Sequence, residues 1–185
     1  LRYARTYNIL AAHGPKSFAG HWELYSEAAD GAYAVYIPGN TPAVIRTPVI
    51  ITDETWHHVA MAIGSTDIVL SVDGTEVGRV PNTRKPLGDA GKWGLTIGAL
   101  QERSLGCSGI LDEIRVSAGQ RRPTAPAAGP VEVDAKTIRL WRLDQEADGW
   151  TPDETAPTEK ARGLVTHTAR EDLGYPTVRR RMEPA

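Results

Sequence analysis

Short apolar segments alternate with turn residues every eight to twelve positions through the first 120 residues, and this spacing limits the folds the chain can adopt. Many short strands divided by turns are typical of a β-sandwich or barrel. Asp30-Gly31 and Asp73-Gly74 are hairpin-turn signals, because glycine tolerates the positive φ that such turns need. No amphipathic helix stands out. We expect strands at 21–25, 32–37, 44–51, 56–63, 67–72, 75–80, 93–98 and 109–116.

The pattern changes after residue 121. Residues 122–136 begin with several prolines and are predicted to be a linker, because proline removes backbone donors and favours extended chain. Residues 137–143 (TIRLWRL) predict one further strand. Residues 144–185 are polar and contain prolines, so we expect a surface loop and tail.

Charge and apolar content exclude two classes of partner. The formal net charge of −2 gives no overall field that would recruit nucleic acid or an acidic membrane. No stretch approaches the roughly 18 apolar residues of a membrane span. Cys107 is the single cysteine, so no disulfide can form within the chain. Nucleic acid and membrane insertion are therefore not expected.

Several segments resemble one family when taken together and in order. They are Trp56-His57-His58-Val59-Ala60, Leu70-Ser71-Val72-Asp73-Gly74, Ile97-Gly98 and the stretch from Gly106 to Ser117. They are similar to the core of laminin G-like domains of the concanavalin A-like lectin/glucanase superfamily. The resemblance covers about residues 6–121 and implies a jelly-roll β-sandwich of two antiparallel sheets, here domain 1–121, with a C-terminal extension.

A second likeness concerns the first forty residues. Asn8-Ile-Leu, His21-Trp-Glu-Leu-Tyr and Tyr36-Ile-Pro-Gly resemble laminin G-like modules of large secreted bacterial multidomain proteins. That resemblance implies a secreted, periplasmic or cell-surface location.

On this resemblance, we expect the block at 1–121 to lack the family's usual opening strand. Residues 137–144 resemble a strand that often precedes such a domain. Two interpretations stay open: the strand at 137–143 docks on the same sandwich, or it begins a second module. We favour docking, since it would cover an open sheet edge. Another chain of a larger assembly could also supply the missing strand.

Aromatic residues are the candidates for ligand binding. Sugar sites use aromatic rings to stack on the apolar faces of pyranoses, with polar groups nearby. Trp22, Tyr36 and Trp93 are the candidates for exposure, whereas Trp56 and Trp141 are expected in the core on the family pattern.

Metal binding has one candidate. Many domains of this superfamily carry calcium, and the resemblance suggests Asp112 as a ligand, with Asp144 or Asp153 as a partner. The alternative is that Asp112 caps backbone amides. His57 and His58 are adjacent, so in a strand their side chains diverge and do not chelate one ion together.

Paired carboxylates for glycoside hydrolysis are not evident in the sequence. Glu132 and Asp134 share a spacing that would fit, but they follow the proline-rich segment, and Asp112 and Glu113 point to opposite faces of a strand. We therefore predict a non-catalytic module that binds a glycan or another extracellular polymer. The alternative is a structural or interaction domain of a larger secreted multidomain or multi-subunit assembly.

Overall fold

The computed structural model describes residues 1, 5–85, 94–121, 124, 129–144, 150–155 and 163–164. Every regular element among these residues is a β-strand, and the strand pairings are antiparallel. The predicted all-β fold is confirmed. None of the described elements is a helix of the length and hydrophobicity that a membrane crossing requires. By its internal contacts the chain divides into two compact units, residues 1–111 with 119–129 and residues 112–118 with 130–185.

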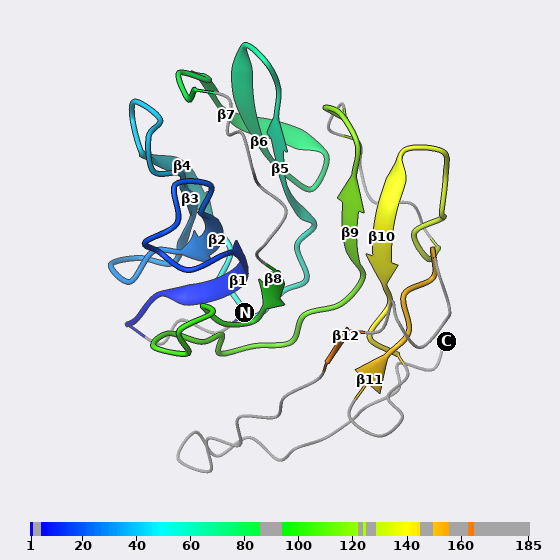
Figure 1. The fold of residues 1–185 in the computed structure, drawn as a ribbon. Coiled ribbons are helices and arrows are strands. Elements are labelled where there is room, and N and C mark those ends of the chain that lie inside the picture. The colour runs from blue at the N-terminus through cyan, green and yellow to red at the C-terminus, as the bar shows by residue number, and fades with distance from the viewer. Residues whose placement is uncertain are drawn as a thin grey trace. The chain divides into compact units, whose positions relative to one another are not determined.

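The larger sheet of the first unit has five strands in the order β4-β3-β2-β1-β8 (Figure 1). β1 and β2 are adjacent in sequence and in space, and β8 returns from far along the chain to pair with β1. The strands are β1 (Asn8–His13), β2 (Trp22–Ser26), β3 (Ala32–Tyr36), β4 (Val44–Ile50) and β8 (Leu95–Ile97).

A three-stranded sheet of order β5-β6-β7 forms the other layer of this unit. The strands are β5 (Val59–Ile63), β6 (Asp67–Val72) and β7 (Thr75–Pro81). The β6–β7 turn has φ values of 50° at Asp73 and 77° at Gly74. Two positive φ values in a two-residue connection are what the Asp-Gly pair favours. This predicted hairpin is confirmed.

The core of the first unit lies between these two sheets. Residues from β1, β3 and β4 meet residues from β6 in one cluster of buried side chains. Because successive side chains on a strand point to opposite faces, Tyr33 and Val35 enter this core while Ala34 and Tyr36 lie on the outer face. The buried members are Leu10, Tyr33, Val35, Ile37, Ile45, Ile51, Ile68, Leu70 and Val72. The two antiparallel sheets form the sandwich that the sequence predicts.

The second unit contains two strand pairs. β9 (Ile114–Ser117) pairs with β10 (Thr137–Trp141), and β11 (Trp150–Thr151) pairs with β12 (Gly163–Leu164). Arg142 directly follows β10, and its guanidinium lies 2.9 Å from the carboxylate of Glu113, which directly precedes β9. This ion pair links the start of β9 to the end of β10. The segment at 137–143 thus forms a strand against β9. Its docking on the sandwich stays a prediction.

The largest differences from the expected strands concern β1, β5 and β9. β1 is not among the strands that the alternation predicts. β5 begins at Val59 instead of Trp56, because the His58 N–H donates to the Asp73 side chain at 2.8 Å and not to a neighbouring strand. β9 begins at Ile114 instead of Gly109, after Glu113 takes a positive φ of 48°.

Candidate functional site

The outer face of the five-stranded sheet carries a cluster of polar and aromatic side chains. On β2, Trp22 and Leu24 pack toward the core between the sheets, so Glu23 and Tyr25 point the other way. The pairing register places Glu23 directly opposite Tyr36 of β3. Strand alternation and register together therefore bring a carboxylate and two phenol rings onto one surface.

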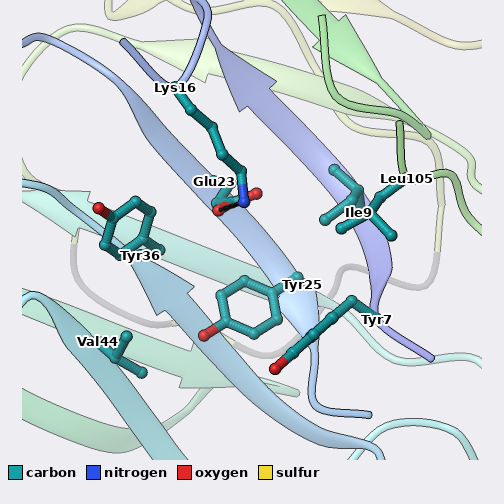
Figure 2. Close-up of a pocket in the computed structure, with 8 residues that line it drawn as sticks. All are labelled: Tyr7, Ile9, Lys16, Glu23, Tyr25, Tyr36, Val44 and Leu105. Atoms are coloured by element: carbon teal, nitrogen blue, oxygen red, sulfur yellow. Dashed lines mark ion pairs between the residues drawn. The ribbon is translucent and has the colours of Figure 1, made fainter. Parts of the chain in front are cut away.

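These side chains line a pocket with a volume of about 300 Å³. That volume is at the lower end of the range for small-ligand sites. Figure 2 shows the Lys16 side chain extending to Glu23, with the rings of Tyr7 and Tyr25 beside one another. The lining residues are Tyr7, Ile9, Lys16, Glu23, Tyr25, Tyr36, Val44 and Leu105.

Glu23 is the buried charge of the pocket, with a side chain only 5% exposed. The Lys16 ammonium lies 3.2 Å from Glu23 Oε1, and its own side chain is 48% exposed. His21 Nε2 lies 3.7 Å from the same oxygen. The second oxygen, Oε2, is buried and has no hydrogen-bond partner within the described part of the chain. Half of this carboxylate's accepting capacity is thus unused.

His21 stands behind Glu23 and is fully buried. Its Nδ1 lies 3.1 Å from the His13 carbonyl oxygen and 3.0 Å from that of Gly14. A carbonyl only accepts, so Nδ1 carries a proton and donates it. Nε2 is left without a hydrogen-bond partner among the described residues. Two neighbouring buried residues, His21 and Glu23, thus each have one polar atom without a hydrogen-bond partner among the described residues.

Three tyrosines form the aromatic wall. The Tyr7 and Tyr25 rings meet edge to face, with centroids 5.6 Å apart. Burial raises the pKa of Tyr25 far above its usual range, and the neighbouring Glu27 carboxylate, which accepts the Tyr25 hydroxyl at 3.3 Å, raises it further. Lys16 Nζ lies 6.0 Å from the centroid of the Tyr36 ring, within reach of a cation–π interaction.

A second histidine–carboxylate cluster lies just before β5. His57 Nδ1 is 2.7 Å from Asp73 Oδ2, and Nε2 is 3.0 Å from Asp53 Oδ1. Thr55 donates its backbone N–H at 3.0 Å and its hydroxyl at 2.8 Å to the same Asp53 oxygen. Those Thr55 hydrogen bonds are the main reason that the pKa of Asp53 is lowered to about 2, and the bond to His57 adds to them.

This second cluster resembles a nucleophile–base–acid triad in its order of groups. Thr55 Oγ1 lies 3.0 Å from His57 Nε2, and Asp73 lies on the opposite ring nitrogen. However, Asp53 contacts Nε2 and accepts the Thr55 hydroxyl proton, so the hydroxyl is not directed at a free base. Asp73 also accepts the His58 N–H. The contacts of His57 and His58 with Asp73 hold the residues just before β5 against the β6–β7 turn.

The predicted ligand-binding residues do not come together in one place. Tyr36 lines the pocket. Trp22 is half-buried, stacks on His13 with ring centroids 5.9 Å apart, and packs against the core from the inner face. Trp93 lies outside the described residues. A ligand-binding role for each of the three stays a prediction.

The expectation that Trp56 is a core residue is wrong, because its side chain is 55% exposed. The chain bends at Glu54 and Thr55 before β5, and His57, not Trp56, contacts Asp73 of the β6–β7 turn. Trp141, at the end of β10, is half-buried.

Asp112, the candidate calcium ligand, is exposed and accepts the Glu113 N–H at 2.9 Å. Although the residue as a whole is exposed, partial desolvation of its carboxyl raises its pKa, and the nearby charge of Asp144 raises it further. Asp153 is engaged elsewhere, with the N–H of Leu140 and Thr155 on one oxygen and Arg139 3.1 Å from the other. No group of three or more His, Cys, Asp or Glu side chains is arranged to hold a metal ion within the described ranges, so calcium at Asp112 stays a prediction.

Sequence reasoning missed most residues of the pocket. The signal for Glu23 and Tyr25 was present, since β2 alternates apolar and polar side chains and places a glutamate among aromatic residues. Lys16 and Tyr7 gave no such signal, because each lies outside a strand and reaches the pocket only through the fold.

One comparison with known proteins gives a match. A family model described as "Concanavalin A-like lectin/glucanases superfamily" (Laminin_G_3) matches residues 3–124. No curated protein and no solved structure matches the chain. The resemblance expected from the sequence motifs is thereby confirmed for the region that holds the sandwich and its pocket.

Proposed function

Because this chain belongs to the concanavalin A-like lectin/glucanase superfamily, we propose that it is a non-catalytic module that binds carbohydrate in the pocket of the five-stranded sheet. The observation that carries the proposal is the meeting of three tyrosine rings with the buried Glu23 carboxylate. Rings of this kind stack on the apolar faces of sugars, and a carboxylate accepts hydrogen bonds from their hydroxyl groups. An extracellular polysaccharide is the natural source of such a ligand.

Binding without hydrolysis is part of the proposal. Glycoside hydrolysis uses two carboxyl groups about 5–9.5 Å apart on either side of the scissile bond. Glu23 is the carboxylate that lines the described pocket, and it is tied to Lys16. This arrangement supports a holding role for Glu23, not proton transfer to a leaving group.

The test is calorimetric titration of the protein with a panel of oligosaccharides. Tyr36→Ala is expected to weaken binding by at least tenfold, since removing an aromatic anchor at the centre of a site costs about 1–2 kcal/mol or more. Trp56→Ala is the matched control, because it removes an exposed ring outside the pocket. Binding of no oligosaccharide, or equal binding by the Tyr36→Ala variant, would reject the proposal.

A second candidate function is an interaction domain within a larger assembly. The observation that favours it is the exposed Trp56, since tryptophan is enriched where protein interfaces form. If this candidate holds, Trp56→Ala reduces co-purification of a partner and leaves oligosaccharide titrations unchanged.

A further inference from the structure

We propose that the pocket selects glycans with free amino groups, and that the protonated amine of a glucosamine-type sugar takes the position that the Lys16 ammonium now holds. This inference rests on the proposed carbohydrate binding and adds the class of sugar. Its starting point is that the protein's own side chain already places an ammonium group in the pocket, 3.2 Å from Glu23 Oε1 and 6.0 Å from the Tyr36 ring centroid.

Lys16 is well suited to give way to a ligand. It belongs to the connection between β1 and β2 and not to a strand. Its side chain is 48% exposed, whereas that of Glu23 is 5% exposed. Lysine carries a flexible stem and a strongly hydrated charge, so the ammonium can return to water with little loss. Glu23 is held within β2 and stays behind as the buried anion.

Glu23 Oε2, which lacks a hydrogen-bond partner, indicates which donor groups a ligand can supply that Lys16 does not. Lys16 pairs with Oε1, while Oε2 has no hydrogen-bond partner among the described residues. An amino sugar presents an ammonium with three donors and hydroxyl donors on the adjacent carbons. Such a ligand can supply both oxygens at once, which a single lysine ammonium at this position does not do.

The charges around the pocket favour a cationic sugar over an acidic one. Glu27 accepts the Tyr25 hydroxyl, and Glu102 accepts the Lys16 backbone N–H at 2.7 Å. Glu23 lines the pocket, and these two further carboxylates accept hydrogen bonds from pocket-lining residues, so carboxylates outnumber the one ammonium of Lys16 among these groups. A uronic acid would meet like charge here, and like charges in a partly buried site repel strongly.

The aromatic wall supports the same choice. The Tyr36 ring already lies under an ammonium group, and tyrosine faces attract cations by their quadrupole. Tyr7 and Tyr25 meet edge to face beside it. A neutral sugar gains stacking from these rings, whereas a protonated amino sugar gains stacking, a cation–π contact and the ion pair with Glu23.

The experiment uses two ligands that differ only at the amine, a β-1,4-linked glucosamine hexamer and its fully N-acetylated form, with an oligogalacturonate as the acidic sugar. Titrations are run on the full chain at a pH where the amines are protonated. The wild-type protein is expected to bind the glucosamine hexamer at least tenfold more tightly than the N-acetylated form, and the galacturonate most weakly.

Two variants address the residues. Lys16→Met keeps the apolar stem and removes the competing ammonium, so binding of the glucosamine hexamer is expected to tighten about threefold or more. Glu23→Gln is expected to abolish the preference for the amine while stacking on the tyrosines persists. The matched controls are Lys85→Met and Glu76→Gln, an exposed lysine and a surface glutamate outside the pocket, and both are expected to behave as wild type.

Each outcome decides between the two proposals. Equal or tighter binding of the N-acetylated or galacturonate oligomer, with loss of that binding in Tyr36→Ala, overturns the amine inference and leaves carbohydrate binding in place. Weaker binding of the glucosamine hexamer by Lys16→Met also overturns the inference. A trilysine peptide that binds as tightly as the glucosamine hexamer also overturns the inference, because the pocket would then recognise an ammonium group and not a sugar. Binding of no oligosaccharide overturns both proposals.

Discussion

Two histidines of the sandwich unit lie beside carboxylates, His21 next to Glu23 on the outer sheet face and His57 between Asp53 and Asp73 before β5. Both ring nitrogens of His57 have carboxylate partners at 2.7 and 3.0 Å. His21 is bonded through Nδ1, whereas its Nε2 and Glu23 Oε2 have no hydrogen-bond partners among the described residues. The satisfied cluster is the more exposed one, and the unsatisfied cluster is buried.

The difference between the clusters separates a structural role from a binding role. Buried polar atoms are normally satisfied, because leaving one without a partner costs about 1–3 kcal/mol. Buried atoms without partners occur elsewhere in the described residues too, but Glu23 lines a pocket, where a ligand can supply the missing hydrogen bond. We therefore expect changes at His57 to act on stability and changes at Glu23 to act on binding.

The largest effect on stability is expected from His57→Ala. The substitution removes the group that joins Asp53 to Asp73 and leaves the two aspartates without the cation between them. Loss of charge-assisted hydrogen bonds is expected to cost about 1–2 kcal/mol, which lowers the melting temperature by roughly 2–8 °C. Trp56→Ala, at the neighbouring exposed position, is the control. It should shift the melting temperature by less than about 2 °C, because exposed substitutions usually change stability by less than about 0.5 kcal/mol. An unchanged melting temperature in His57→Ala would remove the distinction between the clusters.

The pH dependence of that effect gives a finer test. Burial lowers the pKa of His57, but hydrogen bonds to Asp73 and Asp53 outweigh it, so the pKa is raised above 6.5. A raised folded-state pKa stabilises the protein fully below the ordinary value of 6.5, and this contribution is lost as the pH rises through the folded-state pKa. The pKa of Asp53 is lowered from 3.8 to about 2, so its contribution is lost as the pH falls through that range.

The cluster should therefore stabilise the protein most between about pH 4 and 6.5. Melting temperatures of wild type and His57→Gln, measured by differential scanning fluorimetry from pH 3 to 9, should differ most in this window and converge above it. A difference that stays constant with pH would show that His57 acts by packing alone.

The smallest effect on stability is expected from Glu23→Gln. The change removes a buried charge and gives the side chain an N–H group that can donate to His21 Nε2, while the half-exposed Lys16 returns to solvent. The stability is expected to stay within about 1 kcal/mol of wild type, on the stabilising side. Asp73→Asn, the matching change in the other cluster, is expected to destabilise. A clear loss in Glu23→Gln would place Glu23 among the structural residues.

The fold was largely predictable because its signals are local. The Asp73-Gly74 turn takes the two positive φ values that its sequence favours, and the alternation over 67–72 gives β6 within the same bounds. Trp56 was wrongly expected in the core because its exposure depends on a bend at the entrance of β5. The residues that follow the bend, His57 and His58, contact Asp73, which is distant in sequence.

The pocket was less predictable because it depends on register. Glu23 meets Tyr36 only through the pairing of β2 with β3. Lys16 reaches Glu23 through the course of the β1–β2 connection, which alternation does not describe. A shift of one residue in that pairing would turn Glu23 toward the core. The sequence supplies the side chains of such a site, and the three-dimensional pairing decides which of them meet.

The strand β9 has a consequence for how this chain can be divided or recombined. Ile114–Ser117 falls inside the segment matched by the family, residues 3–124, yet its hydrogen-bonded neighbour β10 begins at Thr137. A gene fusion or an expression fragment that ends at residue 124 would therefore keep one strand of a ladder and discard the other, exposing an edge that favours self-association. The family match ends before the strand that completes the β9–β10 pair, so any transplant of the domain should carry the chain through Trp141.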